Sequence, residues 1–346
     1  MEEIHRILET IQHTDLRSVL ATIVHVEGSA YRKEGTSMLF LEDGSQIGVL
    51  SAGCLETTLS LSVPDILASG ASRSFVFDMQ SSDPLSWGEE SGCGGVIHVT
   101  LEPVNDVLAE HLSTLKQYLD DRSEVKLIKR FDTDGSVIDY GYLTRDQQLF
   151  GEWREEFPPS LLEWTSYEEL PRSGMKYIAT LQSDVFVHTY YPKPRLILFG
   201  AGPDARPLAA IAANTGFSVI VSDWRPDYCE RRYFSDAETI LIGFPEETVP
   251  MIHFTSDDYA IVMTHNLRRD KQLIQLLSER QLDYLGILGS KSRTERLLRE
   301  GQVQMKVHFP VGFAIGAEGP EEIAVSILAE IIYTYRTKRK LRSGSL

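Results

Sequence analysis

Five short apolar runs alternate with helical segments in the second half of the chain, and this alternation restricts the fold more than any other feature. The runs are Leu196–Phe199, Val219–Ser222, Thr239–Ile242, Ile261–Thr264 and Leu285–Leu288. They show little polar alternation, which is typical of strands buried on both faces of a parallel sheet. Helices are expected near 203–215, 268–280 and 291–299, and a final helix opens at Pro320. The pattern predicts a doubly wound α/β domain with a parallel sheet.

A glycine-rich turn follows the first of these runs. The segment from Gly200 to Ala205 matches G-x-G-x-x-A directly after a strand and before a helix, where the backbone can approach a pyrophosphate closely. Asp223 ends the second run and is placed to accept ribose hydroxyls. Gly200, Gly202 and Asp223 therefore predict a Rossmann-like domain that binds a nucleotide of the NAD or FAD type. The alternative is a domain of this fold that binds no dinucleotide.

Further polar residues follow the predicted strands at the edge where such sheets bind ligands. His265 follows the fourth strand, and Ser290 and Lys291 follow the fifth, where with Arg293 they could bind a phosphate at a helix N-terminus. The alternative is that Ser290 caps the helix and the cations are solvated. Gly312 lies in a glycine-rich loop that either lines the same crevice or leads directly into the last helix.

The first half of the chain reads as a mixed α+β domain. Helices are expected over residues 1–20, after Cys54 with a kink or break at Pro64, and near 104–120. The pair Asp43-Gly44 predicts a hairpin turn. Strands are expected at Val19–Val26, Ser37–Leu41, Gln46–Leu50, Arg73–Asp78, Val96–Leu101, Glu124–Phe131, Lys176–Thr180 and Val185–Tyr190.

A linker with two prolines, Tyr191-Pro192-Lys193-Pro194, separates the two halves. A chain of 346 residues exceeds the size at which single cores usually divide. We therefore expect an N-terminal domain over residues 1–191, with its core motifs in 19–103, and a C-terminal Rossmann-like domain over 192–346.

Cys54 is the main candidate for a reactive thiol. Ser51 and Gly53 allow a sharp turn that places Cys54 at the start of a helix, where the helix dipole lowers a thiol's pKa. The alternative is a buried, inert thiol, because cysteine is among the most often buried residue types. A second candidate thiol is flanked by glycines in the sequence Ser91-Gly92-Cys93-Gly94-Gly95.

A turn of small residues from Gly28 to Gly35 carries two adjacent cations, Arg32 and Lys33. An arginine there can bind a phosphate or a carboxylate through two parallel hydrogen bonds. The alternative is an ordinary solvated arginine in a turn.

The composition argues against several classes of partner. A net charge of −16 argues against nucleic acid, which is bound by neutralising its phosphates with a basic surface. Three cysteines without a C-x-x-C pair argue against a disulfide framework or a structural zinc site and favour a reducing compartment. The chain has no apolar stretch of about 18 residues and no signal-peptide pattern at its start. We therefore expect a cytoplasmic protein without a membrane span.

Several motifs in order along nearly the whole chain resemble those of the XdhC/CoxI family, accessory proteins that mature xanthine dehydrogenase and related molybdenum hydroxylases. The first half carries G-S-x-x-R-x-x-G at Gly28 to Gly35, S-G-G-C-x-E at Ser51 to Glu56 with Ala52 for its first glycine, and G-C-G-G at Gly92 to Gly95. The second half carries G-A-G at Gly200 to Gly202, L-G-S-[KR] at Leu288 to Lys291, and P-[IV]-G-x-x-I-G-A at Pro310 to Ala317.

The resemblance implies a chaperone that binds the molybdenum cofactor (molybdopterin), protects it during sulfuration by a cysteine desulfurase and inserts it into apo xanthine dehydrogenase or a related hydroxylase. A homodimer is expected. Cys54, and secondarily Cys93, would contact molybdenum or sulfur. The residues expected to contact the cofactor or a nucleotide are Arg32, Ser51, Gly53, Glu56, Gly94, Gly95, Gly200, Gly202, Asp223, His265, Ser290, Lys291 and Gly312.

Three departures from the family pattern favour a carrier over a turnover enzyme. Pro203 stands where a His is usual, and Asn266 and Ala314 stand where an Asp is usual. The rival hypothesis is an NAD(P)-dependent oxidoreductase with His265 as acid or base, although no Lys, His or Asp relay of recognisable spacing accompanies it. A third hypothesis is a redox-sensing regulatory protein that reads a nucleotide through the same crevice.

Overall fold

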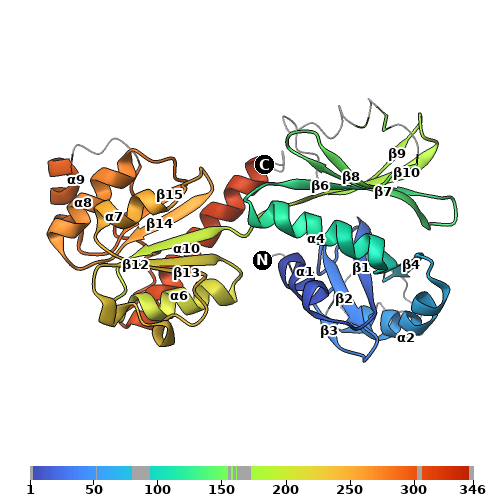
Figure 1. The fold of residues 1–346 in the computed structure, drawn as a ribbon, viewed down its shortest axis with the longest axis horizontal. Helices are drawn as coiled ribbons and strands as arrows, with labels where there is room; N and C mark the ends of the chain where they lie inside the picture. Colours follow the sequence, from blue (N-terminus) through green and yellow to red (C-terminus); the bar gives the residue numbers. More distant parts are fainter. Residues whose placement is uncertain are drawn as a thin grey trace. The chain divides into compact units, whose positions relative to one another are not determined.

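The computed structural model describes residues 3–51, 53–79, 94–154, 157, 158, 161, 173–301 and 306–342. The chain divides into two compact units, Glu2–Pro192 and Lys193–Lys340. Figure 1 shows that the first unit contains two sheets and that the second contains one. Within the described ranges, no helix is both long enough and apolar enough to cross a membrane.

The first unit is built from two antiparallel sheets. The first sheet has the order β3-β2-β1-β5-β4, with β1 (Ser18–Glu27), β2 (Ser37–Leu41), β3 (Gln46–Ile47), β4 (Arg73–Asp78) and β5 (Val96–Pro103). The second sheet has the order β8-β7-β6-β10-β9, with β6 (Val125–Phe131), β7 (Val137–Thr144), β8 (Leu149–Glu152), β9 (Gly174–Ile178) and β10 (Ser183–Tyr190).

Three helices cover the faces of these sheets (Figure 1). Helix α2 (Cys54–Ser69) buries Leu55 and Leu59 against one face of the first sheet. Helices α1 (Ile4–His13) and α4 (Asp106–Asp120) share a core with both sheets, in which Leu8 and Leu112 meet residues of β1, β2, β6, β7 and β10. This shared core joins the two sheets into one unit.

The structure corrects several predictions for the first half. The helix predicted over residues 1–20 ends at His13, because Thr14 is extended and the chain enters β1 at Ser18. Helix α2 continues through Pro64 without a break, since its buried apolar side chains outweigh a cost of about 3 kcal/mol for an internal proline. The hairpin turn at Asp43-Gly44 is confirmed, with the Asp43 side chain accepting from the Ser45 N–H at 2.8 Å.

The second unit has one parallel sheet of order β13-β12-β11-β14-β15. Its strands are β11 (Arg195–Phe199), β12 (Ser218–Asp223), β13 (Thr239–Ile242), β14 (Asp258–Val262) and β15 (Tyr284–Ile287). Its helices are α6 (Ala205–Asn214), α7 (Pro245–Thr248), α8 (Leu267–Ser278), α9 (Lys291–Gly301) and α10 (Pro320–Arg342), with 3-10 turns η1 (Pro226–Tyr228), η2 (Arg231–Tyr233) and η3 (Val249–Met251).

Both faces of the parallel sheet are covered by helices. Side chains of α6 and α10 pack on one face, and those of α8 and α9 pack on the other. This confirms the predicted Rossmann-like, doubly wound domain after a mixed α+β domain. Because the chain order reverses between β11 and β14, the carboxyl ends of these strands form the crevice in which open α/β sheets bind ligands.

Candidate functional site

Three of the motif segments meet at one edge of the first sheet. Neighbouring strands of this sheet run antiparallel, so β1 ends where β2 begins, and β3 ends and β5 begins at the same edge. Residues 28–36 join β1 to β2, residues 48–53 lead from β3 into α2, and residues 94–95 precede β5. The topology therefore brings together segments that are far apart in the sequence. We call this the motif edge.

Glycines allow the segments at the motif edge to pack closely. A Cβ at Gly95 would lie 2.5 Å from the carbonyl oxygens of Glu27 and Ser29, so no side chain fits there. Gly35 has a φ of +86°, and a Cβ on it would lie 1.9 Å from the ring of His188 in the second sheet. These two glycines are needed for packing between the segments.

Ser51 and Glu56 fix the turn that leads into α2. The Ser51 hydroxyl accepts from the N–H groups of Gly53 at 3.2 Å and Leu55 at 3.1 Å, and donates to Glu56. Glu56 Oε1 accepts from the N–H groups of Leu50 at 2.9 Å and Ser51 at 2.7 Å. Burial raises the pKa of Glu56, but these hydrogen bonds outweigh it and hold the pKa below its usual value. The pair therefore positions the helix start where Cys54 lies.

Cys54 is the first residue of α2, as the sequence predicts. The preceding Gly53 adopts a left-handed backbone with φ +119°. A Cβ at Gly53 or at Gly94 would meet no atom within 4 Å, so both glycines border open space. The Cys54 side chain and the whole of Cys93 lie outside the described residues.

Arg32 is half-buried at the motif edge. Its Nε is enclosed and has no hydrogen-bond partner among the described residues. Its guanidinium carbon lies 5.4 Å from the centroid of the Tyr31 ring. A buried N–H without an acceptor is costly, and a bound anion would satisfy it.

Two histidines near the motif edge were not predicted from the sequence. His25 and His98 are cross-strand neighbours on β1 and β5, with ring centroids 5.2 Å apart. Their Nε2 atoms lie 3.6 and 4.0 Å from Glu27 Oε1. Burial and the nearby His25 lower the pKa of His98. Polar residues at alternate positions of apolar strands next to a motif were the signal for this cluster.

In the second unit the two predicted glycines have different environments. A Cβ at Gly200 would lie 2.5 Å from the carbonyl oxygen of Met263, and Gly200 has a φ of +120°. A Cβ at Gly202 would meet no atom within 4 Å. Gly200 therefore serves packing between β11 and the segment after β14, whereas Gly202 borders open space at the crevice.

Asp223 is turned inward instead of facing a ribose site. Its carboxylate accepts from the Ala201 N–H at 2.8 Å and from the guanidinium of Arg225 at 2.7 and 2.9 Å, and its side chain is fully buried. Burial raises the pKa of Asp223, but these bonds hold it below the usual value. The pocket beside it has a volume of about 10 Å³, roughly the space of one water molecule. This geometry does not favour the predicted ribose contact.

His265 has an acid partner that its sequence neighbourhood did not predict. Its Nε2 lies 2.8 Å from Asp204 Oδ2, across the crevice between β11 and β14. His265 is exposed and adopts a left-handed backbone with φ +57°. Non-glycine residues in this region are uncommon and cluster at functional sites.

Ser290 and Lys291 are exposed at the start of α9, with the Ser290 hydroxyl accepting weakly from the Arg293 N–H at 3.4 Å. Arg293 does not join them as a second free cation, because its guanidinium binds the buried Asp270 at 2.6 Å. The expected convergence of two cations on an anion is therefore reduced to Lys291.

Gly312 packs against α10. Its N–H donates to Glu330 Oε2 at 2.6 Å, and a Cβ on it would lie 2.5 Å from Ser326 Oγ. Of the two alternatives for this loop, the geometry favours a tight lead into the last helix. Cys229 is buried, and burial raises its pKa to about 11, which suits an inert thiol.

Comparisons with known proteins agree with this organisation. Residues 12–78 match the XdhC and CoxI family, residues 106–191 match the BH1974-like central domain, and residues 196–331 match the XdhC Rossmann domain. The chain is 40% identical to a protein of Bacillus subtilis (strain 168) named as a probable xanthine dehydrogenase subunit, over 96% of this chain and 98% of that protein. The chain belongs to the XdhC and CoxI family.

Two further proteins resemble this XdhC/CoxI member over most of its length. The molybdenum cofactor insertion chaperone PaoD of Escherichia coli (strain K12) is 25% identical over 91% of this chain and 82% of PaoD. The crystal structure of a protein from Bacillus halodurans, described as a xanthine dehydrogenase, is 43% identical with a TM-score of 0.86 and covers 97% of this chain and 96% of that one. In this family member, the XdhC and CoxI match includes the first two segments of the motif edge.

Proposed function

We propose that this protein binds the molybdenum cofactor and delivers it to a molybdenum hydroxylase. The observation that carries the proposal is the meeting of residues 28–36, 48–53 and 94–95 at one edge of the first sheet. The names of two relatives, a molybdenum cofactor insertion chaperone and a probable xanthine dehydrogenase subunit, support it.

The residues at the motif edge fit the chemistry of such a cofactor. The enclosed Nε–H of Arg32 can donate to a phosphate. Open space beside Gly53 and Gly94 suits a flat pterin ring. Cys54 at a helix N-terminus is placed to supply a soft thiolate. When bound, the cofactor provides the molybdenum redox centre that the target enzyme uses.

The proposal includes the partners that the motif resemblance implies. We expect sulfuration of the carried cofactor by a cysteine desulfurase and its insertion into apo xanthine dehydrogenase or a related hydroxylase, in purine catabolism. We expect the carrier to be a homodimer. Pull-down of the full chain with the desulfurase and the apo-hydroxylase, and its mass in solution, test these partners separately from cofactor binding.

Mass spectrometry of ligands released from the protein, purified anaerobically from a molybdenum-supplied host, tests the proposal directly. We expect molybdopterin. The Cys54→Ser variant should fold normally but fail to activate the target hydroxylase, because serine lacks the soft sulfur ligand. Cys229→Ala, which removes the buried thiol, serves as the control and should retain activation. Equal cofactor loading and equal target activity in wild type and Cys54→Ser would contradict the role of Cys54.

An NAD(P)-dependent oxidoreductase is the second candidate function, and the exposed pair of His265 and Asp204 favours it. The enclosed carboxylate of Asp223 argues against it. A carrier should show no hydride transfer, so steady formation of NADH with any small alcohol, acid or aldehyde would contradict the carrier function and support the enzyme.

The crevice of the second unit is proposed to bind a nucleotide or the nucleotide-like end of a molybdenum cofactor. Gly202 borders open space, so Gly202→Val places a branched side chain at the crevice without a clash in the unliganded protein. Calorimetric titration of the full chain with NAD, FAD, AMP, CDP and molybdopterin should give heat that the variant loses. Absence of heat with all five compounds would show that the glycine pattern serves the fold alone.

A further inference from the structure

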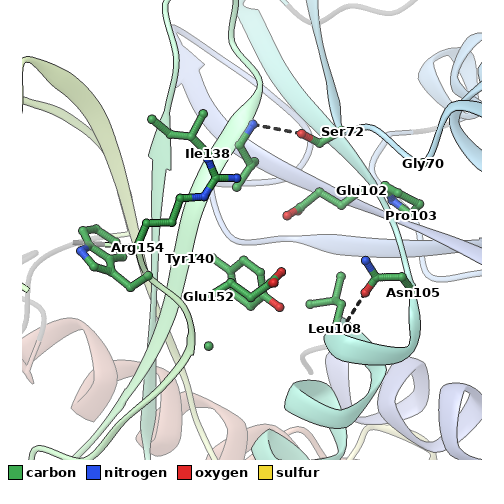
Figure 2. A pocket seen from close by; sticks show the side chains of 13 residues that line it. Gly70, Ser72, Glu102, Pro103, Asn105, Leu108, Ile138, Tyr140, Glu152 and Arg154 are labelled. Atoms are coloured by element: carbon green, nitrogen blue, oxygen red, sulfur yellow. Dashed lines mark hydrogen bonds between the residues drawn. The ribbon is translucent and has the colours of Figure 1, made fainter. Parts of the chain in front are cut away.

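A pocket of about 400 Å³ lies at the opposite edge of the first sheet from the motif edge. It is bordered by the end of β5, the start of α4 and strands β7 and β8 of the second sheet. Figure 2 shows Glu102, Tyr140 and Glu152 directing their oxygen atoms toward the same space. Its volume is in the range of small-molecule sites.

The two carboxylates of the pocket differ in how their charge is compensated. Glu102 is buried and forms an ion pair with the buried Lys129. Glu152 is exposed and accepts from the Tyr140 hydroxyl, and no cation pairs with it among the described residues. The pocket therefore has one uncompensated negative charge beside a hydrogen-bonded phenol.

The Tyr140 hydroxyl is held in place from a second side. Its oxygen lies 2.9 Å from His111 Nδ1 on α4. Burial, together with the charges of Glu152 and Glu102, raises the pKa of Tyr140 well above its usual value. The phenol therefore stays protonated at neutral pH and donates to Glu152, which leaves the other carboxylate lone pairs for a ligand.

The remaining walls combine apolar surface with few competing positive charges. Pro103, Leu108 and Ile138 line the pocket and would contact an apolar body. Arg154 is the only cation among the lining residues that the structure describes, and it is directed to Asp139, with its Nε 3.8 Å from Asp139 Oδ1 and its side chain 80% exposed. The lining thus favours a positively charged group over an anion.

We propose that this pocket binds a small organic amine, with the protonated nitrogen against Glu152 and Glu102 and the apolar body against Pro103, Leu108 and Ile138. The site is separate from the motif edge and from the crevice of the second unit. Its ligand therefore adds a second binding activity to the proposed carrier function.

Three compounds of matched shape and different charge test the proposal: phenethylamine, 2-phenylethanol and phenylacetate. Titration of the full chain by calorimetry at millimolar concentrations should show binding of phenethylamine, with 2-phenylethanol about tenfold weaker because it lacks the charge-assisted hydrogen bond. Phenylacetate should not bind. Equal binding of the amine and the alcohol, or no binding of the amine, would overturn the proposal.

Glu152→Gln keeps the size of the side chain and removes its charge. Because Glu152 is exposed, the variant should fold, and its thermal unfolding checks this. We expect it to lose the preference for phenethylamine over 2-phenylethanol. Glu110→Gln, at an exposed position of α4 that does not line the pocket, is the matched control and should keep the preference. Loss of the preference in both variants would refute a role for Glu152.

Discussion

Single residues explain why particular motif positions carry particular side chains, and Glu56 is the clearest case. Its carboxylate is ionised to hold the turn before α2, so Glu56→Gln should lower the free energy of unfolding by about 1–3 kcal/mol at neutral pH. The folded pKa lies below the unfolded one, so this stability is present above pH 4.5 and is lost as the pH falls through the folded value. Urea unfolding of both proteins should therefore show a gap that shrinks in acid. The exposed Glu110→Gln variant is the control, and a gap independent of pH would contradict the role of Glu56.

Elements depend on glycine where two of them come close, and the segment between β1 and β2 shows this. Gly35 and Gly44 both have positive φ values, +86° and +88°, so alanine is strained at either position. Only at Gly35 does the added Cβ also overlap the His188 ring, whereas Gly44 borders open space. Gly35→Ala should therefore cost about 1–3 kcal/mol more than Gly44→Ala in chemical denaturation. Equal losses would mean that the segment does not need its close contact with β10.

The whole molecule divides its cores between the two units, and this predicts independent folding. The two large clusters around the parallel sheet use residues from Leu196 to Ile331 alone. A fragment from Lys193 to Leu346 should therefore unfold cooperatively, with a Tm close to one transition of the full chain, as measured by circular dichroism. A fragment that starts at Gly216 lacks β11, which lies between β12 and β14, and should not fold. Failure of the first fragment to fold would contradict the division of the cores.

Local pattern was sufficient for the second unit. Its strands are short and apolar on both faces, so each is recognisable without knowledge of its neighbours, and all five predicted runs overlap observed strands. In the first unit, β7 and β8 were missed, since Val137–Thr144 and Leu149–Glu152 mix polar residues and glycine among apolar ones. Their pairing with β6 and each other, a long-range interaction, makes them strands.

The sequence by itself determined the fold class and the family, because periodicity, glycine turns and ordered motifs are properties of neighbouring residues. Only the tertiary structure decided which side chains meet. Asp204 lies 61 residues from His265 in the sequence, and the inward turn of Asp223 depends on Arg225 closing over it. The motif edge and the Glu152 pocket likewise join segments from different strands. Such contacts follow from the path of the backbone through antiparallel and parallel sheets, which no local pattern records.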